Sequence, residues 1–338
     1  MTEQLPLVSI ITPAYNRASL LSETIESVLK QDYPNIEYIV LDDGSTDGTR
    51  AVMEKYHGRI IAEYHTNIGE QRTVNKGWSM THGDIIGTVN SDDPLLPGAV
   101  STAVAFFAEH PDIVVTYPDW DVIGPHSEFI WHVQVPEYDY VRMVREHYCM
   151  PGVGTFFRRW VWEKAGGRDP DFRYTGDYEF WLRAGLVGKF ARIPKTLATW
   201  RRHPGAATLS LSGEKMAAEH IRLIEKLYTR TDLPAEVLKV HAEALRQANH
   251  VASGICLETG NTKAGMQYYR KSIRRNYKWL VGFWRPLPVL LYRWLIASPN
   301  AKRIHKWLIP GFLRPGLNRL VQSVYAGGKK VFDGWVLR

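Results

Sequence analysis

The sequence predicts an α/β fold with a mainly parallel sheet, followed by a helical region. Short apolar runs typical of buried strands alternate with segments of helical periodicity up to residue 89. The 338 residues are 45% hydrophobic and 23% charged, which suits a globular chain of one large or two ordinary domains. Beyond Ser212 the apolar pattern is purely helical. We therefore expect an α/β domain over 1–212, a helical hairpin region over 213–276 and a tail over 277–338.

The first four strands alternate with helices in a regular order. Ligands bind parallel sheets at the carboxyl ends of the strands, where the clusters TPAYN, LDDGS and VNSDD follow three of the expected strands. The alternative to a binding site is that each cluster, taken alone, consists of the polar residues of an ordinary turn. Strands are expected over 8–12, 36–43, 59–65 and 84–89, and helices over 19–29 and 70–80.

The later elements are less regular. A strand-like segment, 198–200, ends in the basic residues Arg201, Arg202 and His203. A Gly-Asn turn near 259–262 breaks the last amphipathic pattern. Strands are expected over 113–118 and within 151–159, and helices over 177–188, 214–230 and 234–276.

The net charge of +7 is unevenly distributed along the chain. Residues 271–338 contain fourteen Lys or Arg and a single acid, Asp333, so this end carries +13 and the remainder carries −6. Five of the twelve tryptophans lie in the same end. A mildly acidic body is therefore joined to a basic, aromatic tail.

The apolar stretch 279–297 within the tail contains Arg285 and Arg293. Each arginine at a bilayer centre costs roughly 2.5–3.5 kcal/mol, which disfavours a membrane span. Tryptophan and arginine suit the headgroup level of an anionic membrane surface, so the tail is expected to associate with the inner face of a membrane. A basic helical subdomain packed on the body is the alternative.

Several common classes of site lack their sequence motifs. GxGxxG, GxxxxGK[ST], HExxH and GxSxG are all absent. The two cysteines, Cys149 and Cys256, lie far apart and fit no metal spacing, and the N-terminus does not resemble a signal peptide, so we expect a reducing, cytoplasmic setting. The basic tail carries no nucleic-acid motif, and no nucleic-acid partner is expected.

Adjacent carboxylates, Asp92 and Asp93, follow the fourth expected strand. Such a pair is costly to desolvate unless a cation, backbone donors or solvent stabilises it. Mg²⁺ is commonly held by one or two carboxylates together with substrate phosphates. Asp92 is therefore a candidate ligand for a divalent cation that holds a diphosphate.

Five motifs in order carry a resemblance to a known family. They are TPAYN, SVLKQDYPNIEYIVLDDGSTDGT, NIGEQRTVNKGW, THGDIIGTVNSDD and GDYEFWLRAG. Over about residues 6–205, the chain resembles the family 2 glycosyltransferases of GT-A fold. The resemblance implies inverting transfer of a sugar from a nucleotide-diphospho-sugar, with Mn²⁺ or Mg²⁺ as cofactor.

The resemblance also implies residues for the donor nucleotide. Pro13 and Tyr15 would flank the base and ribose, and Asp43 would accept a hydrogen bond from the imide of the base. That contact favours uridine or thymidine diphosphate over a cytidine donor and leaves guanosine open. Asp42 is either a second donor contact or a residue that orients the turn.

The segment NIGEQRTVNKG corresponds to another donor-binding part of the family. Gln71 and Asn75 would lie near the donor, and a solvated helix face is the alternative for each. Arg72 is one cationic candidate for the diphosphate.

The D-x-D metal motif of the family reads Asn90-Ser91-Asp92 in this chain. The resemblance implies that Asp92 contacts the metal and that Asn90 contacts the ribose through its amide. Asp93 would support the turn or ligate in place of Asp92. The Arg201–His203 segment would lend a basic residue to the diphosphate or, through His203, a ligand to the metal; a surface basic cluster is the alternative.

For the chemical step, Asp177 matches the general base of the family. A helix N-cap is the alternative role for Asp177. Gly176 stands where family members often carry Glu. Trp181, one helical turn later, is either part of the acceptor site or a core tryptophan. Glu179 is expected to face solvent or the acceptor.

The predicted function is transfer to an acceptor hydroxyl during assembly of a cell-surface polysaccharide or a lipid-linked glycan. A module that binds nucleotide sugars or acts as a scaffold without turnover, with a membrane-binding tail, is the alternative that Asn90 and Gly176 would favour. A nucleotidyltransferase is less suited, because its glycine- and Lys/Arg-rich first loop is missing from VSIITPAYNRAS.

Overall fold

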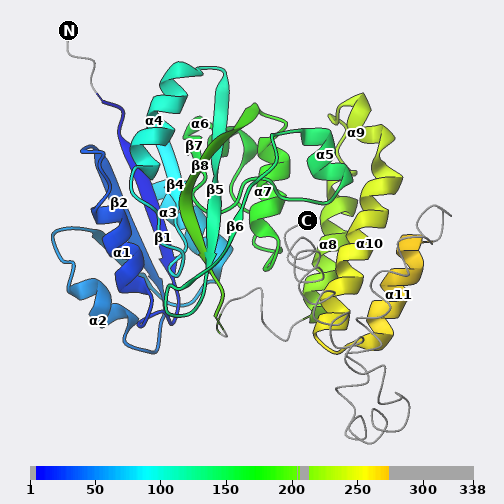
Figure 1. Cartoon of the computed structure of the whole chain (residues 1–338), viewed down its shortest axis with the longest axis horizontal. Coiled ribbons are helices and arrows are strands. Elements are labelled where there is room, and N and C mark those ends of the chain that lie inside the picture. The colour runs from blue at the N-terminus through cyan, green and yellow to red at the C-terminus, as the bar shows by residue number, and fades with distance from the viewer. Residues whose placement is uncertain (1–4, 204, 206–212, 274–338) are drawn as a thin grey trace, which may run out of the picture.

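The computed structural model of the chain describes residues 5–203, 205 and 213–273 (Figure 1). Within them, one mixed sheet of eight strands lies at the centre of the body, flanked by helices. The predicted α/β fold with a mainly parallel sheet is therefore confirmed. The strands are β1 (Val8–Ala14), β2 (Ile36–Asp43), β3 (Ile61–His65), β4 (Ile85–Thr88), β5 (Ile113–Ile123), β6 (Phe129–Val133), β7 (Phe156–Arg158) and β8 (Lys189–Arg201).

The strand order is β3-β2-β1-β4-β7-β5-β6, with β8 paired to β5. The first four strands are parallel to one another, and β7 runs antiparallel between β4 and β5. The register places Ala14 of β1 beside Asp42 of β2. The ends of β1, β2 and β4 consequently meet at one edge of the sheet, as the sequence predicts.

Each predicted helical segment contains helix. The helix predicted over 70–80 forms with those bounds, whereas the helix predicted over 177–188 ends at Ala184. The helices are α1 (Leu21–Leu29), α2 (Thr49–Glu54), α3 (Glu70–Met80), α4 (Ala99–Glu109), α5 (Tyr140–Arg145), α6 (Trp160–Ala165), α7 (Gly176–Ala184), α8 (Gly213–Leu227), α9 (Ala235–Lys239), α10 (His241–Glu258) and α11 (Thr262–Ile273). The structure thus adds α2, α4, α5 and α6, which the sequence did not predict.

Strands β5 and β8 are longer than the sequence indicates. The predicted strand stops at Pro118, but β5 continues to Ile123 and pairs in parallel with β8 along its length. Proline removes a ladder donor and usually ends a strand pattern, unless a bulge accommodates it. The register between β5 and β8 shifts at Pro118, so an irregularity of this kind lets the strand continue.

Trp78 of α3 is the centre of the packing between α3, the sheet and α7. It is fully buried, with ring centroids 5.3 Å from Phe157 and 4.8 Å from Phe180, and its Nε1 donates to Thr88 Oγ1 at 3.0 Å. Gly77 allows the close approach of the helix, because a Cβ there would lie 2.8 Å from Ile11 Cδ1. This packing fixes α3, whose first turn faces the strand ends.

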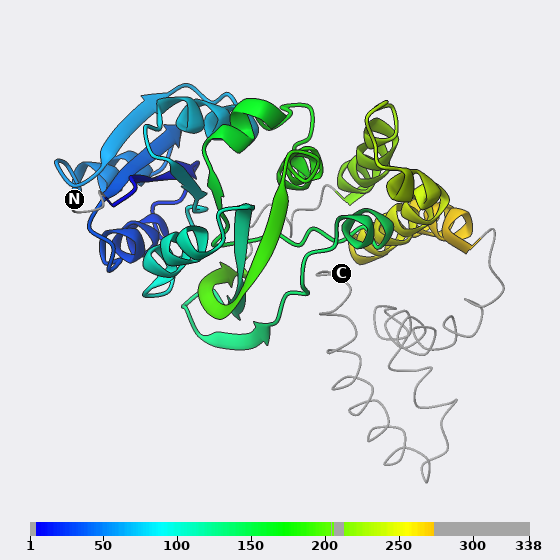
Figure 2. The same cartoon turned by 90° about the horizontal axis from the view of Figure 1, so that it is seen from above.

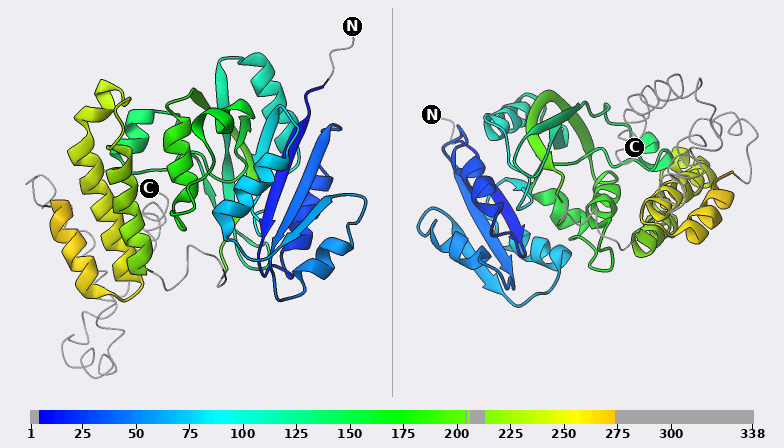
Figure 3. Two further views of the ribbon diagram at one scale, coloured as in Figure 1. Left: turned by 180° about the vertical axis from the view of Figure 1, so that it is seen from behind. Right: turned by 60° about the horizontal axis from the view of Figure 1, so that its bottom comes forward.

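The C-terminal helices α8, α10 and α11 stand side by side next to α7, at the opposite end of the molecule from β3 (Figure 2 and Figure 3). The predicted break falls between α10 and α11, where Gly260 adopts a φ of +83°. The proposed boundary at Ser212 remains a prediction. None of the described helices is long and apolar enough to cross a bilayer. The tail, 277–338, lies outside the described residues.

Substitution of Trp78 tests this packing. We expect Trp78→Ala to lower the free energy of unfolding by about 3–5 kcal/mol, because it removes a large buried ring and leaves a cavity. Leu238→Ala is the control, since Leu238 is 53% exposed, and it should change stability by no more than about 0.5 kcal/mol. Urea unfolding measures both. Equal losses in the two variants would contradict this role for Trp78.

Candidate active site

The loops that follow β1 and β2 are bound to each other at the edge of the sheet. Asn16 adopts a left-handed backbone conformation, its N–H donates to Ser45 Oγ at 2.9 Å, and its Oδ1 accepts from the Thr46 N–H at 2.8 Å. Tyr15, just before it, is 46% exposed, whereas Pro13 is buried within β1. Of the predicted pair Pro13 and Tyr15, only Tyr15 is therefore accessible to a ligand, and it offers an aromatic ring.

The two acids at the end of β2 are both buried and both bind backbone N–H groups. Asp42 Oδ1 accepts from Ser45 at 2.9 Å, which supports its role in the turn. Asp43 accepts from Ile68 at 2.7 Å and from Gly69 at 3.0 Å, so it holds the loop that leads into α3. A carboxylate has about four lone-pair sites, which leaves acceptor capacity for a further N–H group.

Asp92 lies between two cationic or metal-ligating side chains. Its Oδ2 is 2.9 Å from His203 Nε2 and 3.2 Å from Arg17 Nε. The structure thus brings together the two predicted metal ligands, Asp92 and His203, although they are 111 residues apart. Arg17 was not among the predicted residues, and only its place four residues after Pro13 could have indicated it.

Asn90 and Asp93 stabilise the turn around Asp92. Asn90 Nδ2 donates to Asp93 Oδ2 at 2.8 Å, and the backbone N–H of Arg201 donates to Asp93 Oδ1 at 2.7 Å. Burial, and then the charge of Asp92, raises the pKa of Asp93 well above its usual range. Ser91 is also buried. One N–H of the Asn90 amide thus binds Asp93, which leaves its second N–H and its carbonyl oxygen for the predicted ribose contact.

Arg201 and Arg202 do not form the expected basic cluster at the diphosphate. Arg201 is 1% exposed, and its Nε donates to the Asp92 carbonyl at 2.9 Å. Its Nη2 lies 2.7 Å from Glu23 Oε2 on α1. Arg202 lies over the ring of Trp131. Of the three residues, His203 alone reaches the Asp92 carboxylate, so the expectation for Arg201 is corrected: it has a structural role.

Gln71 and Asn75 on α3 bind the segment that leads to Asp177. Gln71 Nε2 donates to the Arg173 carbonyl at 3.3 Å. Asn75 binds the backbone of Arg168 through both its Nδ2, at 2.8 Å, and its Oδ1, at 2.7 Å. Neither is a residue of a solvated helix face, and both connect the donor side of the site to Asp177. Arg72 remains exposed.

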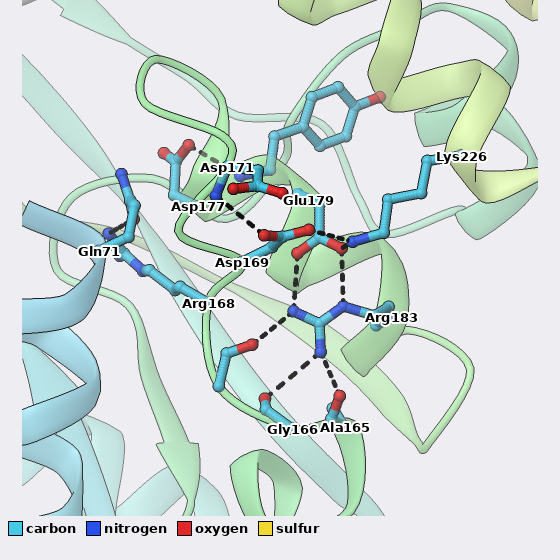
Figure 4. A network of polar contacts seen from close by, with 12 residues as sticks. Gln71, Ala165, Gly166, Arg168, Asp169, Asp171, Asp177, Glu179, Arg183 and Lys226 are labelled. Atoms are coloured by element: carbon cyan, nitrogen blue, oxygen red, sulfur yellow. Dashed lines mark hydrogen bonds and ion pairs between the residues drawn. The ribbon is translucent and has the colours of Figure 1, made fainter.

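Asp177 lies in the first turn of α7 with its side chain exposed (Figure 4). The alternative role as N-cap is wrong, because the capping position is Thr175 and Asp177 Oδ1 accepts from the adjacent Tyr178 N–H at 2.7 Å. Gly176 has a steric explanation, since a Cβ there would lie 2.5 Å from Gln71 Cδ. A glutamate at 176 would clash with the Gln71 contact described above.

Trp181 and Glu179 lie away from solvent. Trp181 is 5% exposed, and its ring packs against Phe180, Phe157 and Phe190. The acceptor contact expected for Trp181 is therefore corrected to a core role. Glu179 is 3% exposed and pairs with Arg183 at 2.7 Å and Lys226 at 2.6 Å, so it faces neither solvent nor acceptor.

Glu70 and Arg168 are site residues that the sequence did not indicate. Glu70 begins α3, is half-exposed and interacts electrostatically with both Asp92 and Asp177. Its Oε1 is 3.8 Å from Arg168 Nη1. Arg168 is largely buried and also donates to Gln71 Oε1 at 3.3 Å. Burial raises the pKa of Glu70, the charge of Arg168 lowers it, and the charges of Asp177 and Asp92 raise it further, so these carboxylates lie near one another.

The donor set suits an ion that is completed by substrate. No group of three His, Cys, Asp or Glu residues that could hold a metal occurs in the described part of the chain. Asp92 and His203 supply one oxygen and one nitrogen ligand within 2.9 Å of each other. A cation there would need its other ligands from phosphate oxygens and water, which is how Mg²⁺ is commonly held.

The chain matches the family model described as glycosyl transferase family 2 over residues 9–163. It is 29% identical over 212 residues to an uncharacterised glycosyltransferase of Rickettsia typhi, covering 60% of this chain and 66% of that protein. It is also 29% identical over 198 residues to the chondroitin synthase of Pasteurella multocida, covering 57% of this chain and 20% of that protein. The chain thus spans just under two thirds of the first relative and a fifth of the second.

Solved structures share the fold. The S. aureus TarS structure in complex with UDP-GlcNAc aligns with a TM-score of 0.58 at 18% identity, covering 78% of this chain and 92% of that one. A mannosyltransferase of Pyrobaculum calidifontis in complex with GDP-Man and Mn²⁺ aligns with a TM-score of 0.54 at 17% identity, covering 81% of this chain and 89% of that one. At these identities the likeness concerns the fold alone, which is of GT-A type. Together, the family match and the relatives support a family 2 glycosyltransferase, in agreement with the resemblance found in the sequence.

Proposed function

We propose that this glycosyltransferase is inverting and moves a sugar from a nucleotide-diphospho-sugar to an acceptor hydroxyl. One observation carries the proposal: Asp92 contacts His203 and Arg17, and Asp92 and Asp177 both act on the charge of the same residue, Glu70. The groups around Asp92 would bind a diphosphate, and the exposed carboxylate of Asp177 would accept a proton. A scaffold without turnover would have no use for both.

For the donor nucleotide, we propose that the exposed ring of Tyr15 stacks on the base. Asp43 would accept the imide N–H of the base with the lone pairs that Ile68 and Gly69 leave free. This contact favours uridine or thymidine diphosphate. The TarS complex with UDP-GlcNAc agrees with that preference, while the mannosyltransferase complex with GDP-Man shows that the same fold also accepts guanosine.

For the diphosphate, we propose that Arg17 binds its oxygens through charge-assisted hydrogen bonds. Asp92 and His203 would hold a divalent cation, of which Mn²⁺ suits the imidazole better than Mg²⁺. Such an ion, when bound, stabilises negative charge on the leaving diphosphate. Arg17, which lies 3.2 Å from Asp92 Oδ2, would provide the same stabilisation from the protein itself.

For the chemical step, Asp177 would act as general base. Its carboxylate is exposed in the first turn of α7, where an acceptor hydroxyl could approach it. Asp177 takes the proton of the acceptor hydroxyl while the acceptor oxygen forms a bond to the anomeric carbon. The bond from that carbon to the diphosphate breaks on the opposite face, so the configuration inverts.

For the acceptor, we propose a growing polysaccharide or a lipid-linked glycan. The Pasteurella chondroitin synthase among the relatives favours the first. A membrane-associated acceptor would suit the basic, tryptophan-rich sequence of residues 277–338.

Replacement of Asp177 tests the chemical step. We expect Asp177→Asn to lower the kcat for nucleotide release by at least about 100-fold, because the amide cannot take a proton. The measurement is a release assay with Mn²⁺ across UDP-, dTDP- and GDP-sugars, first with water as acceptor. Asp171→Asn is the matched control, since Asp171 is an exposed acid on the preceding loop. Full turnover by Asp177→Asn would show that another group is the base.

Replacement of Asp92 tests the diphosphate site. We expect Asp92→Ala to weaken UDP binding in the presence of Mn²⁺ by at least about 10-fold, since it removes a ligand of the ion that bridges the phosphates. EDTA should weaken binding to the wild type but leave the variant unchanged. Asp32→Ala, which alters an exposed acid before β2 at the opposite edge of the sheet, is the control. Calorimetry measures each affinity, and a wild type insensitive to EDTA would argue against the ion.

Removal of residues 277–338 tests the membrane proposal. We expect the whole chain to float with phosphatidylglycerol-containing vesicles, because its basic residues are attracted to anionic lipid. The shortened chain should remain in the bottom fraction of the gradient. Vesicles of phosphatidylcholine alone are the control, and added salt should weaken flotation. Equal flotation of the two chains would contradict the proposal.

A further inference from the structure

We infer that Glu219, on helix α8 of the C-terminal region, is a positioning residue that holds Asp177 in place. The inference rests on the proposed function, since it concerns the residue proposed there as general base. Glu219 lies beyond the region matched by the family model, which ends at residue 163. It would make α8 part of the catalytic apparatus.

The Glu219 carboxylate binds three consecutive backbone N–H groups. Oε1 accepts from Arg173 at 3.0 Å, and Oε2 accepts from Tyr174 at 2.7 Å and from Thr175 at 3.2 Å. The Glu219 side chain is largely buried, with 9% of the residue exposed. Successive N–H groups directed at one anion form a rigid concave arrangement, here completed by a carboxylate from a distant helix.

These three N–H groups lie just before α7. Thr175 is the N-cap residue of that helix, its side chain makes no capping hydrogen bond to α7, and Asp177 is two residues further on. The start of α7 is therefore fixed from outside the helix, by Glu219. The backbone of 173–175 leads directly into the turn that carries Asp177. A shift of this backbone would therefore also move Asp177.

The same loop is held at further points along its length (Figure 4). Lys226 of α8 pairs with Asp169 at 2.5 Å, and Arg222 of α8 donates to the Asp171 carbonyl. From the opposite side, Gln71 of α3 donates to the Arg173 carbonyl at 3.3 Å. The Arg173 backbone is thus bound on one side by α3, which begins at Glu70, and on the other by α8.

This arrangement assigns α8 a place in the reaction. The donor side of the site is built from the ends of β1, β2 and β4, none of which contacts Glu219 in the described hydrogen bonds. Loss of Glu219 should consequently disturb the base without disturbing the nucleotide site. A misplacement of about 1 Å at a reacting group is enough to lower a rate about 100-fold.

The experiment compares Glu219→Ala and Glu219→Gln with Glu225→Ala, an exposed glutamate on the same helix. We expect Glu219→Ala to lower the kcat for nucleotide release by about 10- to 100-fold while the Kd for UDP with Mn²⁺ stays within about twofold. Glu219→Gln should lower this kcat by less, because the carbonyl oxygen of glutamine still accepts hydrogen bonds from N–H groups. Hydrogen exchange should accelerate at Arg173, Tyr174 and Thr175 in Glu219→Ala and remain unchanged in Glu225→Ala.

Three results would overturn the inference. They are a kcat for Glu219→Ala equal to that of the wild type, unchanged exchange at 173–175, and a loss of UDP affinity and thermal stability that accounts for the whole loss of activity. Asp177→Asn, assayed alongside, separates this inference from the proposed function. If Asp177→Asn is inactive while Glu219→Ala is fully active, only the inference fails. If Asp177→Asn turns over normally, or the wild type releases no nucleotide, the proposed function fails and the inference falls with it.

Discussion

The buried guanidinium of Arg201 is the interaction on which the donor side of the site depends. A charge with 1% exposure is stable only when its donors are satisfied, and Arg201 donates to the Asp92 carbonyl, to Glu23 of α1, and to Gly124 and Ser127 of the turn after β5. Its backbone N–H also binds Asp93. One residue therefore connects the end of β8 to the loop after β4 and to α1. His203, two residues further on, reaches Asp92 because this connection fixes the end of β8.

Two halves of the site are built in different ways. The proposed donor half consists of strand ends and short loops, which neighbouring strands hold in register. The proposed general base, Asp177, instead follows a loop without regular structure, Arg168–Thr175, which depends on side chains from α3 and α8. Asn75 and Glu219 bind the backbone of this loop from opposite sides. A strand end needs little further support, whereas an irregular loop that leads into the helix of the proposed base needs several hydrogen bonds to hold one conformation.

The corrections share one physical cause. Trp181 and Asp177 are separated by one helical turn, and the sequence left open whether Trp181 faces the acceptor with Asp177 or lies in the core. The packing of α7 against Phe157 and Phe190 buries Trp181 while Asp177, in the first turn, remains exposed. Similarly, Arg201 looked like a surface cation, yet its pairing in β8 directs it inward. Which face of a helix or strand is buried depends on its neighbours, and residue spacing alone does not specify them.

The sequence by itself determined the first four strands and the helices α1 and α3, the edge where the polar clusters meet, and the candidates Asp92 and Asp177. Apolar periodicity and strand-end motifs are local properties, so a single sequence reveals them. Only the tertiary structure decided that Arg17 and His203 meet at Asp92, and that Glu219 binds the loop before Asp177. These contacts join residues between 44 and 111 positions apart, and their formation depends on strand register and helix packing across the whole fold.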